Sequence, residues 1–393
     1  MKNILPQTFI DYTRPLMGDE CFERYLHSFE EDAPVSIRLN PMKTKGMEPI
    51  DGEPVPWCRN GYYLKQRPNF TMDPLFHAGC YYVQEAASMF LDEVLRQHLT
   101  AHRSPFTALD MCAAPGGKST LLRAALPADS TLISNEPIRQ RASILAENVE
   151  KWGYPNHLVT SNYPKAFRAT KSRFDVILCD VPCSGEGMFR KDPATIREWS
   201  PQNVEKCWRL QREIVADAWQ CLNPGGLLIY STCTFNTKEN EENISWILSE
   251  YDAQALAVET KAEWNITGSL LNGFDEPVYR FIPGISRGEG LFLCVIQKGG
   301  DRSEKIAMAP AEKLASQCSP QKCELSYQQA ISYLRGEALR LSDDTPRGEV
   351  TVCFLGHPLG MVKNIGSRAN NLYPKPWRIK TTHIPEDYEP ILR

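Results

Sequence analysis

The chain has 393 residues, a net charge of −4 and an apolar fraction of 42%, so it is too long for one ordinary domain and apolar enough for a core in each of two or three. The slight acidity excludes a surface that binds nucleic acid everywhere, and any contact with RNA or DNA must therefore use local basic patches. Because the 13 cysteines form no CxxC pair and no apolar signal or membrane segment occurs, we expect a reducing cytoplasm with no metal, disulfide framework or membrane contact.

Residues 1–74 are predicted to form a small α+β domain. Apolar residues recur near helical spacing through the first thirty positions, and 34–41 then alternates between apolar and polar residues as a strand does. Arg38 and Asn40 fall on the polar face of that strand, for which exposure to solvent is the simplest interpretation.

Residues 75–298 alternate between strands and helices. The order of elements predicts an α/β fold, a Rossmann-like parallel sheet covered by helices on both faces. Expected strands are 107–111, 130–134, 157–160, 174–179, 226–230 and 290–296, and expected helices are 81–98, 118–125, 139–149, 202–221 and 237–250.

The polar and charged stretch 299–324 is predicted to be a linker, and 325–393 a small β-rich domain with a short helix at 326–334 and a strand at 349–355. The run 361–380 contains no acidic residue and combines basic with aromatic residues, a mixture that suits phosphate contact and base stacking. A solvated basic face is the alternative. The residues concerned are Lys363, Arg368, Tyr373, Lys375, Trp377, Arg378 and Lys380.

A turn of small residues follows the first strand of the predicted sheet and leads into a helix. We call it the cofactor loop; it consists of Cys112, Ala113, Ala114, Pro115, Gly116, Gly117 and Lys118. Small residues let the backbone approach a ligand, and the first N–H groups of a helix face electron-rich groups. The spacing is neither a dinucleotide fingerprint nor a Walker motif, and taken alone an ordinary tight turn would explain it.

The next two strand ends supply polar side chains that fit a nucleoside. Glu136 is placed where a carboxylate accepts hydrogen bonds from a ribose diol, and Asn162 is placed where an amide can recognise an adenine amino group. Together with the cofactor loop they predict a ligand that contains adenosine.

Two cysteines follow the fourth and fifth strands. Asp180 ends the fourth strand and precedes Cys183, whereas Cys233 lies just beyond the fifth. A single thiol at a strand end is usually an inert small hydrophobe. Two thiols opposite a nucleoside site suggest reactivity, because helix N-termini or nearby cations such as Arg190 and Lys191 lower thiol pKa values.

The segments CAAPGGK, DVPCSGEG and STCT, in this order, resemble motifs of the RNA cytosine-5 methyltransferases of the Nop and Sun type. The likeness is strongest to the bacterial RsmF-like enzymes that modify 16S ribosomal RNA, and it covers nearly the whole chain, including GCYYVQEAAS from Gly79, RKDP from Arg190 and GHPLG from Gly356. It implies a class I methyltransferase domain that uses S-adenosylmethionine, flanked by an N-terminal RNA-facing domain and a C-terminal PUA-like domain. We expect a monomer that acts on 16S rRNA or the small ribosomal subunit and not on DNA.

The resemblance also implies chemical roles. Cys233 would be the nucleophile that adds to cytosine C6, after which C5 attacks the methyl group, and Cys183 would assist release of the product. Asp180, which also borders the cofactor, would hold the cytosine N3 and amino edge. Lys191 and Arg190 would meet a phosphate or the base, although a surface role for Arg190 is equally open.

For the cofactor, the resemblance implies that the cofactor loop wraps the methionine part, that Glu136 holds the ribose, and that Asn162, where many relatives carry Asp, lies at the adenine. Lys118 would organise the site rather than act as a base.

Two other functions remain open. The substrate could be tRNA, although the C-terminal domain favours rRNA, or the chain could be a ribosome-assembly factor that binds RNA without methylating it. A binding module needs neither Cys233 nor Cys183, which argues against the assembly factor. Because a target base must leave its stack to reach Cys233, a loop or an unfolded rRNA region is the expected substrate.

Overall fold

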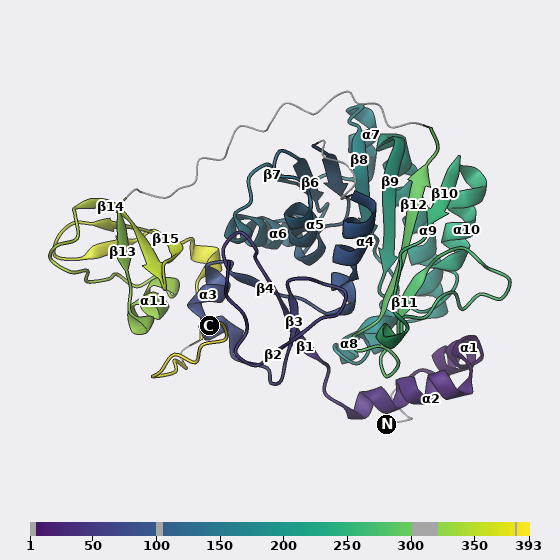
Figure 1. Ribbon diagram of the computed structural model, residues 1–393, viewed down its shortest axis with the longest axis horizontal. Coiled ribbons are helices and arrows are strands. Elements are labelled where there is room, and N and C mark those ends of the chain that lie inside the picture. Colours follow the sequence, from purple (N-terminus) through teal and green to yellow (C-terminus); the bar gives the residue numbers. More distant parts are fainter. Residues whose placement is uncertain (1–4, 100–104, 301–320, 382) are drawn as a thin grey trace.

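The computed structural model describes residues 5–99, 105–300, 321–381 and 383–393 (Figure 1). It contains a central eight-stranded sheet, a four-stranded sheet near the N-terminus and another four-stranded sheet near the C-terminus. No helix in these described ranges combines the length and apolarity needed to cross a membrane.

The central sheet has five parallel strands that extend to one edge and antiparallel strands at the other edge. In order across the sheet, its strands are β10 (Ala253–Leu256), β12 (Leu291–Lys298), β9 (Leu222–Thr232), β8 (Phe174–Asp180), β5 (Thr107–Asp110), β6 (Thr131–Asn135) and β7 (His157–Thr160), with β11 (Tyr279–Phe281) also paired to β12. From β9 to β7 all neighbours are parallel, whereas β12 is antiparallel to β9, β10 and β11. The prediction of a Rossmann-like α/β sheet is confirmed.

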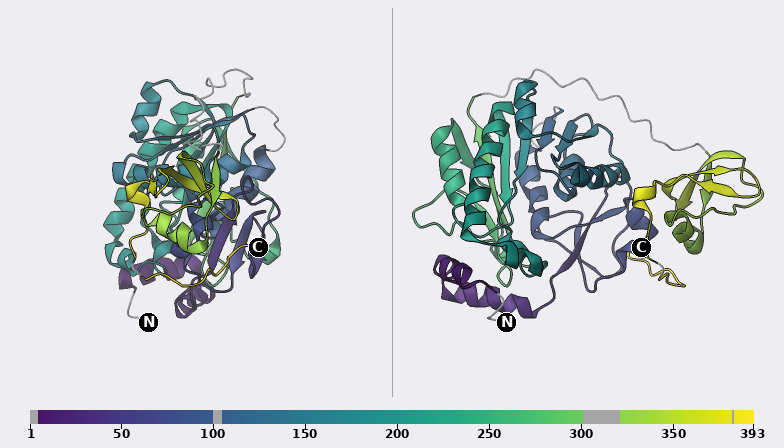
Figure 2. Two further views of the ribbon diagram at one scale, coloured as in Figure 1. Left: turned by 90° about the vertical axis from the view of Figure 1, so that its left-hand side faces the viewer. Right: turned by 180° about the vertical axis from the view of Figure 1, so that it is seen from behind.

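Helices cover both faces of this sheet, as Figures 1 and 2 show. They are α4 (Phe90–Leu99), α5 (Gly117–Ala125), α6 (Arg139–Trp152), α7 (Pro164–Ala169), α9 (Pro201–Cys221) and α10 (Glu241–Glu250). The side chains of β8 alternate between two cores because successive residues of a strand point to opposite faces. Val176 and Leu178 pack with α4 and α5, whereas Ile177 and Cys179 pack with α9 and α10.

The N-terminal part begins with α1 (Gln7–Met17) and α2 (Asp19–His27), followed by an antiparallel sheet. The strands of that sheet are, in order, β2 (Gly52–Pro54), β3 (Gly61–Leu64), β1 (Val35–Leu39) and β4 (Tyr81–Val83). The predicted helix over 81–98 is therefore wrong at its start, since β4 pairs with β1 and α4 begins only at Phe90. Aromatic and β-branched residues such as Tyr81 and Val83 favour a pleated surface when a neighbouring strand is present.

Arg38 and Asn40, expected to face solvent, are buried and join the N-terminal sheet to the central domain. The Arg38 guanidinium donates to Gln84 Oε1 at 2.7 Å and to Thr120 Oγ1 at 2.6 Å, and it lies 4.5 Å from the ring centroid of Trp152. Asn40 Nδ2 donates to the carbonyl of Trp152 at 2.8 Å. Alternation identifies the two faces of a strand, but here a second domain covers the polar face.

The C-terminal part contains β13 (Lys322–Glu324), α11 (Tyr327–Leu334), β14 (Gly348–Phe354), β15 (His357–Asn364) and β16 (Ala369–Asn371). The helix and first long strand predicted there are confirmed. Most of the predicted linker lies outside the described residues, but its last residues form β13, which pairs with β14 in parallel.

The C-terminal and N-terminal parts share one hydrophobic core, which contains Ile37 and Leu75 from one side and Ile331 and Val352 from the other. In Figure 1 the C-terminal strands accordingly lie beside α3 (Pro74–His77). The C-terminal part is thus packed on the N-terminal part and does not hang free from its connecting segment.

Candidate active site

The carboxyl ends of the parallel strands bring the predicted site residues to one edge of the sheet. Asp110 ends β5, Glu136 follows β6, Asn162 follows β7, Asp180 ends β8 and Cys233 follows β9. Ligands of open α/β sheets bind at this edge.

The cofactor loop is held by its own backbone geometry and by α6. Gly116 has φ +116°, a left-handed conformation that favours glycine, and α5 starts directly after it. From α6, Arg141 donates to the carbonyl of Ala114 at 3.1 Å and Asn148 donates to that of Pro115 at 2.8 Å. The loop is therefore fixed between β5 and α5 in the position that the sequence predicts.

The part of the site predicted to hold a nucleoside contains a buried residue that the sequence analysis missed. Asn135 is buried, and its amide donates to the carbonyls of Met111 and Asn162 and accepts from the Asn162 N–H at 3.0 Å. Glu136 is buried and accepts from the Ile138 N–H at 3.0 Å. The side chain of Asn162 is exposed, so its position leaves it accessible to a ligand.

Lys118 and Asp180 form an ion pair at the centre of the edge. Lys118 Nζ lies 2.8 Å from Asp180 Oδ2, and Ser231 Oγ donates to Asp180 Oδ1 at 2.6 Å. Burial acts to lower the pKa of Lys118, but Asp180 and the nearby Cys233 more than offset this and raise it. Lys118 therefore carries its positive charge into the site, as the expected organising role requires.

The two cysteines predicted to be reactive are in contact. Cys183 Sγ and Cys233 Sγ lie 3.3 Å apart, and the Cys233 N–H points to Cys183 Sγ at 3.4 Å. Both side chains are half-buried. Gly187 donates its N–H to the Cys233 carbonyl at 2.7 Å, and a Cβ at Gly187 would lie 2.6 Å from that oxygen, so only glycine allows this approach.

Behind the thiols lies a buried polar network that the sequence analysis did not identify. Glu186 accepts from the N–H groups of Phe235 and Asn236 and from Trp199 Nε1, and Glu239 accepts from the Ser184 N–H at 3.0 Å. The predicted helix over 237–250 hid this network, because α10 begins only at Glu241. The sequence did carry a signal of this network, because acidic residues would fall on the core-facing side of the predicted helix.

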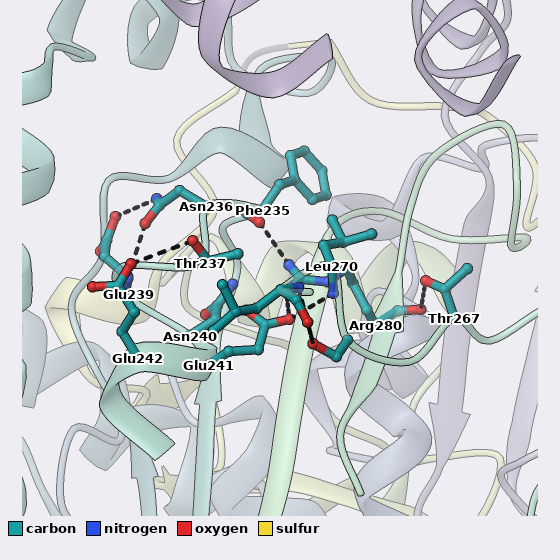
Figure 3. Close-up of polar contacts among 12 residues, drawn as sticks. Phe235, Asn236, Thr237, Glu239, Asn240, Glu241, Glu242, Thr267, Leu270 and Arg280 are labelled. Carbon is teal, nitrogen blue, oxygen red and sulfur yellow. Dashed lines mark hydrogen bonds and ion pairs between the residues drawn. The ribbon is translucent and has the colours of Figure 1, made fainter. Parts of the chain in front are cut away.

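A buried ion pair also holds the segment that follows Cys233. Arg280 and Glu241 are both fully buried and paired, and Arg280 Nη1 donates to the carbonyl of Phe235 at 2.8 Å (Figure 3). Glu241 also accepts from the Leu270 N–H at 2.9 Å. The backbone that follows Cys233 is therefore tied to β11.

The N-terminal helices cover the loops that carry the cysteines. The ring of Phe9 in α1 lies 5.1 Å from that of Phe189 and 5.3 Å from that of Trp199, and the ring of Tyr25 in α2 lies 5.4 Å from that of Phe235. These edge-to-face contacts couple α1 and α2 to the site.

Arg190 does not offer its charge to a ligand. Its guanidinium is buried in an ion pair with Glu289, at 2.6 Å, and donates to the Ser28 carbonyl at 3.1 Å. The suggestion that Arg190 meets a phosphate or the base, or lies at the surface, is wrong; it ties the Cys183 loop to the rest of the fold. Lys191 is exposed one residue further on.

The basic run 361–380 divides into structural and exposed residues. Tyr373 belongs to the core, and Arg378 is half-buried against Gly336, so neither is placed for base stacking or phosphate contact as expected. The ring of the half-buried Trp377 has its centroid 5.4 Å from Lys151 Nζ. The exposed cations are Lys363, Arg368, Lys375 and Lys380.

The fold and the candidate site together are those of a Rossmann-like α/β domain with its polar side chains gathered at the carboxyl edge of the sheet. A solved methyltransferase homologue from Pyrococcus horikoshii is similar to 75% of this chain over its whole length, with a TM-score of 0.58 and 26% identity. NSun6 from the same organism matches 77% of this chain, again over its whole length, with a TM-score of 0.62 and 19% identity, and so shows the fold alone.

The chain belongs to the RsmB/F family of 16S rRNA methyltransferases, whose model matches residues 97–297. Models of the N-terminal domain and the PUA domain of RsmF match residues 5–86 and 320–379. The predicted family and its three-part architecture are thereby confirmed.

Among curated relatives, the ribosomal RNA small subunit methyltransferase F of Pectobacterium atrosepticum is 32% identical over 75% of this chain and 63% of its own length, less than two thirds. That of Cronobacter sakazakii is 26% identical over 94% of this chain and 96% of its own length.

Proposed function

We propose that this protein transfers a methyl group from S-adenosylmethionine to C5 of a cytosine in 16S rRNA, through a covalent bond between Cys233 and C6 of the base. The contact of Cys183 with Cys233, beside the Lys118–Asp180 ion pair, is the observation that supports this most. A reaction that needs one nucleophile and one group to assist its release requires two thiols within reach of the same base.

The side chains at the strand ends fit the methyl donor. Glu136 would hold the ribose and Asn162 the adenine, and Ile138 and Tyr163, which are 54% and 69% exposed, offer apolar surface beside them. Asp110 is buried at the end of β5 and accepts from Ser119 Oγ at 2.5 Å, so it would support the cofactor loop from beneath the ligand. S-adenosylmethionine supplies an electrophilic methyl group carried on a sulfonium.

The thiols would act in sequence. The Cys233 thiolate would add to C6, which forms the S–C6 bond and places electron density on C5, so that C5 would take the methyl group and leave S-adenosylhomocysteine. A base would then take the C5 proton, the S–C6 bond would break with return of the Cys233 thiolate, and the C5–C6 double bond would be restored. Cys183, in contact with Cys233, is placed to assist this release.

Asp180 and Lys118 would orient the base. The carboxylate of Asp180 would face the cytosine N3 and amino edge, while Lys118 and Ser231 hold that carboxylate in place. Transition-state charge on a base is stabilised best by groups that are already oriented before the reaction. Lys191, exposed beside the Cys183 loop, would contact an RNA phosphate.

The flanking parts would bind the RNA. We propose residues 1–74 and 325–393 as RNA-binding domains around a catalytic domain over 75–298, with the exposed cations of the run 361–380 facing phosphates. The protein would act as a cytoplasmic monomer, and its target base would leave its stack to reach Cys233.

The test measures transfer of tritium from labelled S-adenosylmethionine to 16S rRNA, to assembled small subunits and to tRNA. Digestion of the product to nucleosides then identifies the modified base. We expect 5-methylcytidine in 16S rRNA with wild type, and no transfer with Cys233→Ala.

The matched control is Cys323→Ala, a half-buried thiol of β13 in the C-terminal part, which should transfer as wild type does. Transfer to tRNA alone would favour the tRNA enzyme. Binding of rRNA with no transfer to any substrate would favour an assembly factor, and a methylated base other than cytosine would refute the proposed chemistry.

A further inference from the structure

The buried carboxylate of Glu239 lies directly behind the two thiols. Glu239 is fully buried, and the groups that donate hydrogen bonds to its carboxylate are all uncharged. Its carboxylate accepts from Asn236 Nδ2 at 2.8 Å, from Gln211 Nε2 at 2.7 Å and from the N–H of Ser184 at 3.0 Å. Figure 3 shows the Asn236 and Glu239 side chains turned toward each other.

A buried carboxylate without a cation lowers the stability of the folded state. A carboxylate buried without a cation loses its hydration, and N–H donors replace that hydration only in part. Burial raises the pKa of Glu239 to about 7, against the lowering effect of its bonds to Ser184 and Asn236. A Gln at this position would remove the charge, but its NH2 group would replace an oxygen that accepts N–H bonds.

Each of the three donors belongs to an element of the cysteine site. Ser184 follows Cys183 directly, and Asn236 comes three residues after Cys233. Gln211, in α9, also donates to the carbonyl of Pro182 at 2.9 Å, on the other side of Cys183. The Glu239 carboxylate therefore joins the loop of one cysteine to the loop of the other.

We propose that Glu239 is a positioning residue of the cysteine pair, which fixes Cys183 against Cys233 through the Ser184 N–H and keeps Cys183 a thiol while Cys233 reacts. This role rests on the proposed function, which assigns different work to the two thiols.

The electrostatics around Cys183 agree with this role. The hydrogen bond with Cys233 and burial raise the pKa of Cys183, and the negative charges of Cys233 and Glu239 add to that. Cys233 in turn helps to raise the pKa of Lys118, which lies on the other side of the site beside Asp180. Other ionisable groups around Glu239 are Glu186, Tyr230 and Cys207.

The test measures alkylation of each cysteine by iodoacetamide in the reduced full-length protein, without RNA or methyl donor. Trypsin leaves Cys183 with the buried Cys179 in one peptide, 174–190, and Cys233 with the buried Cys221 in another, 213–238. Fragment-ion spectra assign the label within each peptide. Cys179 and Cys221 thus report unfolding in the same measurement.

We expect Glu239→Gln to accelerate alkylation of Cys183 by about tenfold when the pH is at least one unit above the Glu239 pKa of about 7, because a nearby negative charge disfavours the thiolate by roughly one pKa unit. Cys179 and Cys221 should remain unreactive. Glu239→Asp, which keeps the charge but shortens its reach, should give an intermediate rate.

The matched control is Asp73→Asn, which removes a buried carboxylate that likewise accepts three hydrogen bonds, from Leu75, Tyr81 and Tyr388, far from the thiols. An unchanged Cys183 rate in Glu239→Gln, or an equal increase in Asp73→Asn, would overturn the positioning role. Because alkylation needs no methyl transfer, a protein that fails to methylate RNA would refute the proposed function and leave this result to decide the role of Glu239.

Discussion

Lys118 Nζ and Asp180 Oδ2 lie 2.8 Å apart at the carboxyl edge of the central sheet. One residue opens the helix after β5 and the other ends β8, so the pair joins the cofactor loop to the strand that precedes Cys183. This places a fixed cation between the predicted methyl-donor site and the thiols.

Lys118→Met should lower kcat for methyl transfer about 100-fold or more, because it removes a charge that is oriented before the reaction. Lys191→Met should instead raise KM for RNA with a smaller effect on kcat, since Lys191 is exposed and would contact a phosphate. Steady-state kinetics of the two variants measure the difference. An equal loss of kcat in both would contradict the separate roles.

The stability of the protein should fall in mild acid because two histidines are buried uncharged. Burial lowers the pKa of His77 to about 4 and that of His157 to about 3, from 6.5. The unfolded state binds more protons than the folded state below about pH 6.5, so stability is fully present above that pH and declines as pH falls toward about 4 and 3.

Thermal unfolding of wild type over this range should therefore show a midpoint that decreases with acidity. His77→Gln combined with His157→Gln should flatten the decline, even if it lowers the midpoint at neutral pH. If the unfolding midpoint of the double variant falls with pH as steeply as that of wild type, other groups cause the loss of stability in acid.

The contact between the C-terminal segment and the N-terminal part should contribute to stability. Tyr388 and the Leu75 N–H both donate to Asp73 Oδ1, at 3.1 and 3.0 Å, and Tyr81 donates to Asp73 Oδ2 at 2.7 Å. Tyr388→Phe should lower the free energy of unfolding by about 1 kcal/mol, because it removes one bond to a buried carboxylate. Denaturant titration measures this, and an unchanged midpoint would mean that the contact is not formed in solution.

Replacement of Lys363, Arg368, Lys375 and Lys380 by Ser should weaken binding of 16S rRNA and reduce the slope of log Kd against log salt by about 3, since each phosphate contact contributes roughly 0.7 for single-stranded RNA. Lys171→Ser with Arg173→Ser, which lie before β8 at the opposite edge of the sheet, is the control. A slope that changes only in the control would refute the assignment of the RNA-binding face.

The sequence predicted the parts of the fold that local pattern determines. The strand that ends at Asp180, the helix that starts after Gly116 and the cysteines beyond two adjacent strands follow from periodicity and turn residues, and the structure has them in these places. The motif resemblance added the family, which the comparisons confirm.

What the sequence left out depends on contacts between distant segments. Arg38 looked exposed because nothing local shows that Thr120 and Trp152 would cover it. Glu239 looked like part of a helix, although its bonds to Ser184 and Gln211 require that residues 237–240 stay outside α10. Arg190 pairs with Glu289, 99 positions away, and no local pattern predicts that partner.

The central claim is that Cys233 is the nucleophile and that Cys183 releases the product. Its most direct test is a denaturing gel of 16S rRNA incubated with S-adenosylmethionine and wild type, Cys183→Ala, or Cys183→Ala combined with Cys233→Ala. We predict a covalent protein–RNA adduct that accumulates with Cys183→Ala and is absent from the double variant. An adduct that persists in the double variant, which lacks Cys233, would contradict the assignment.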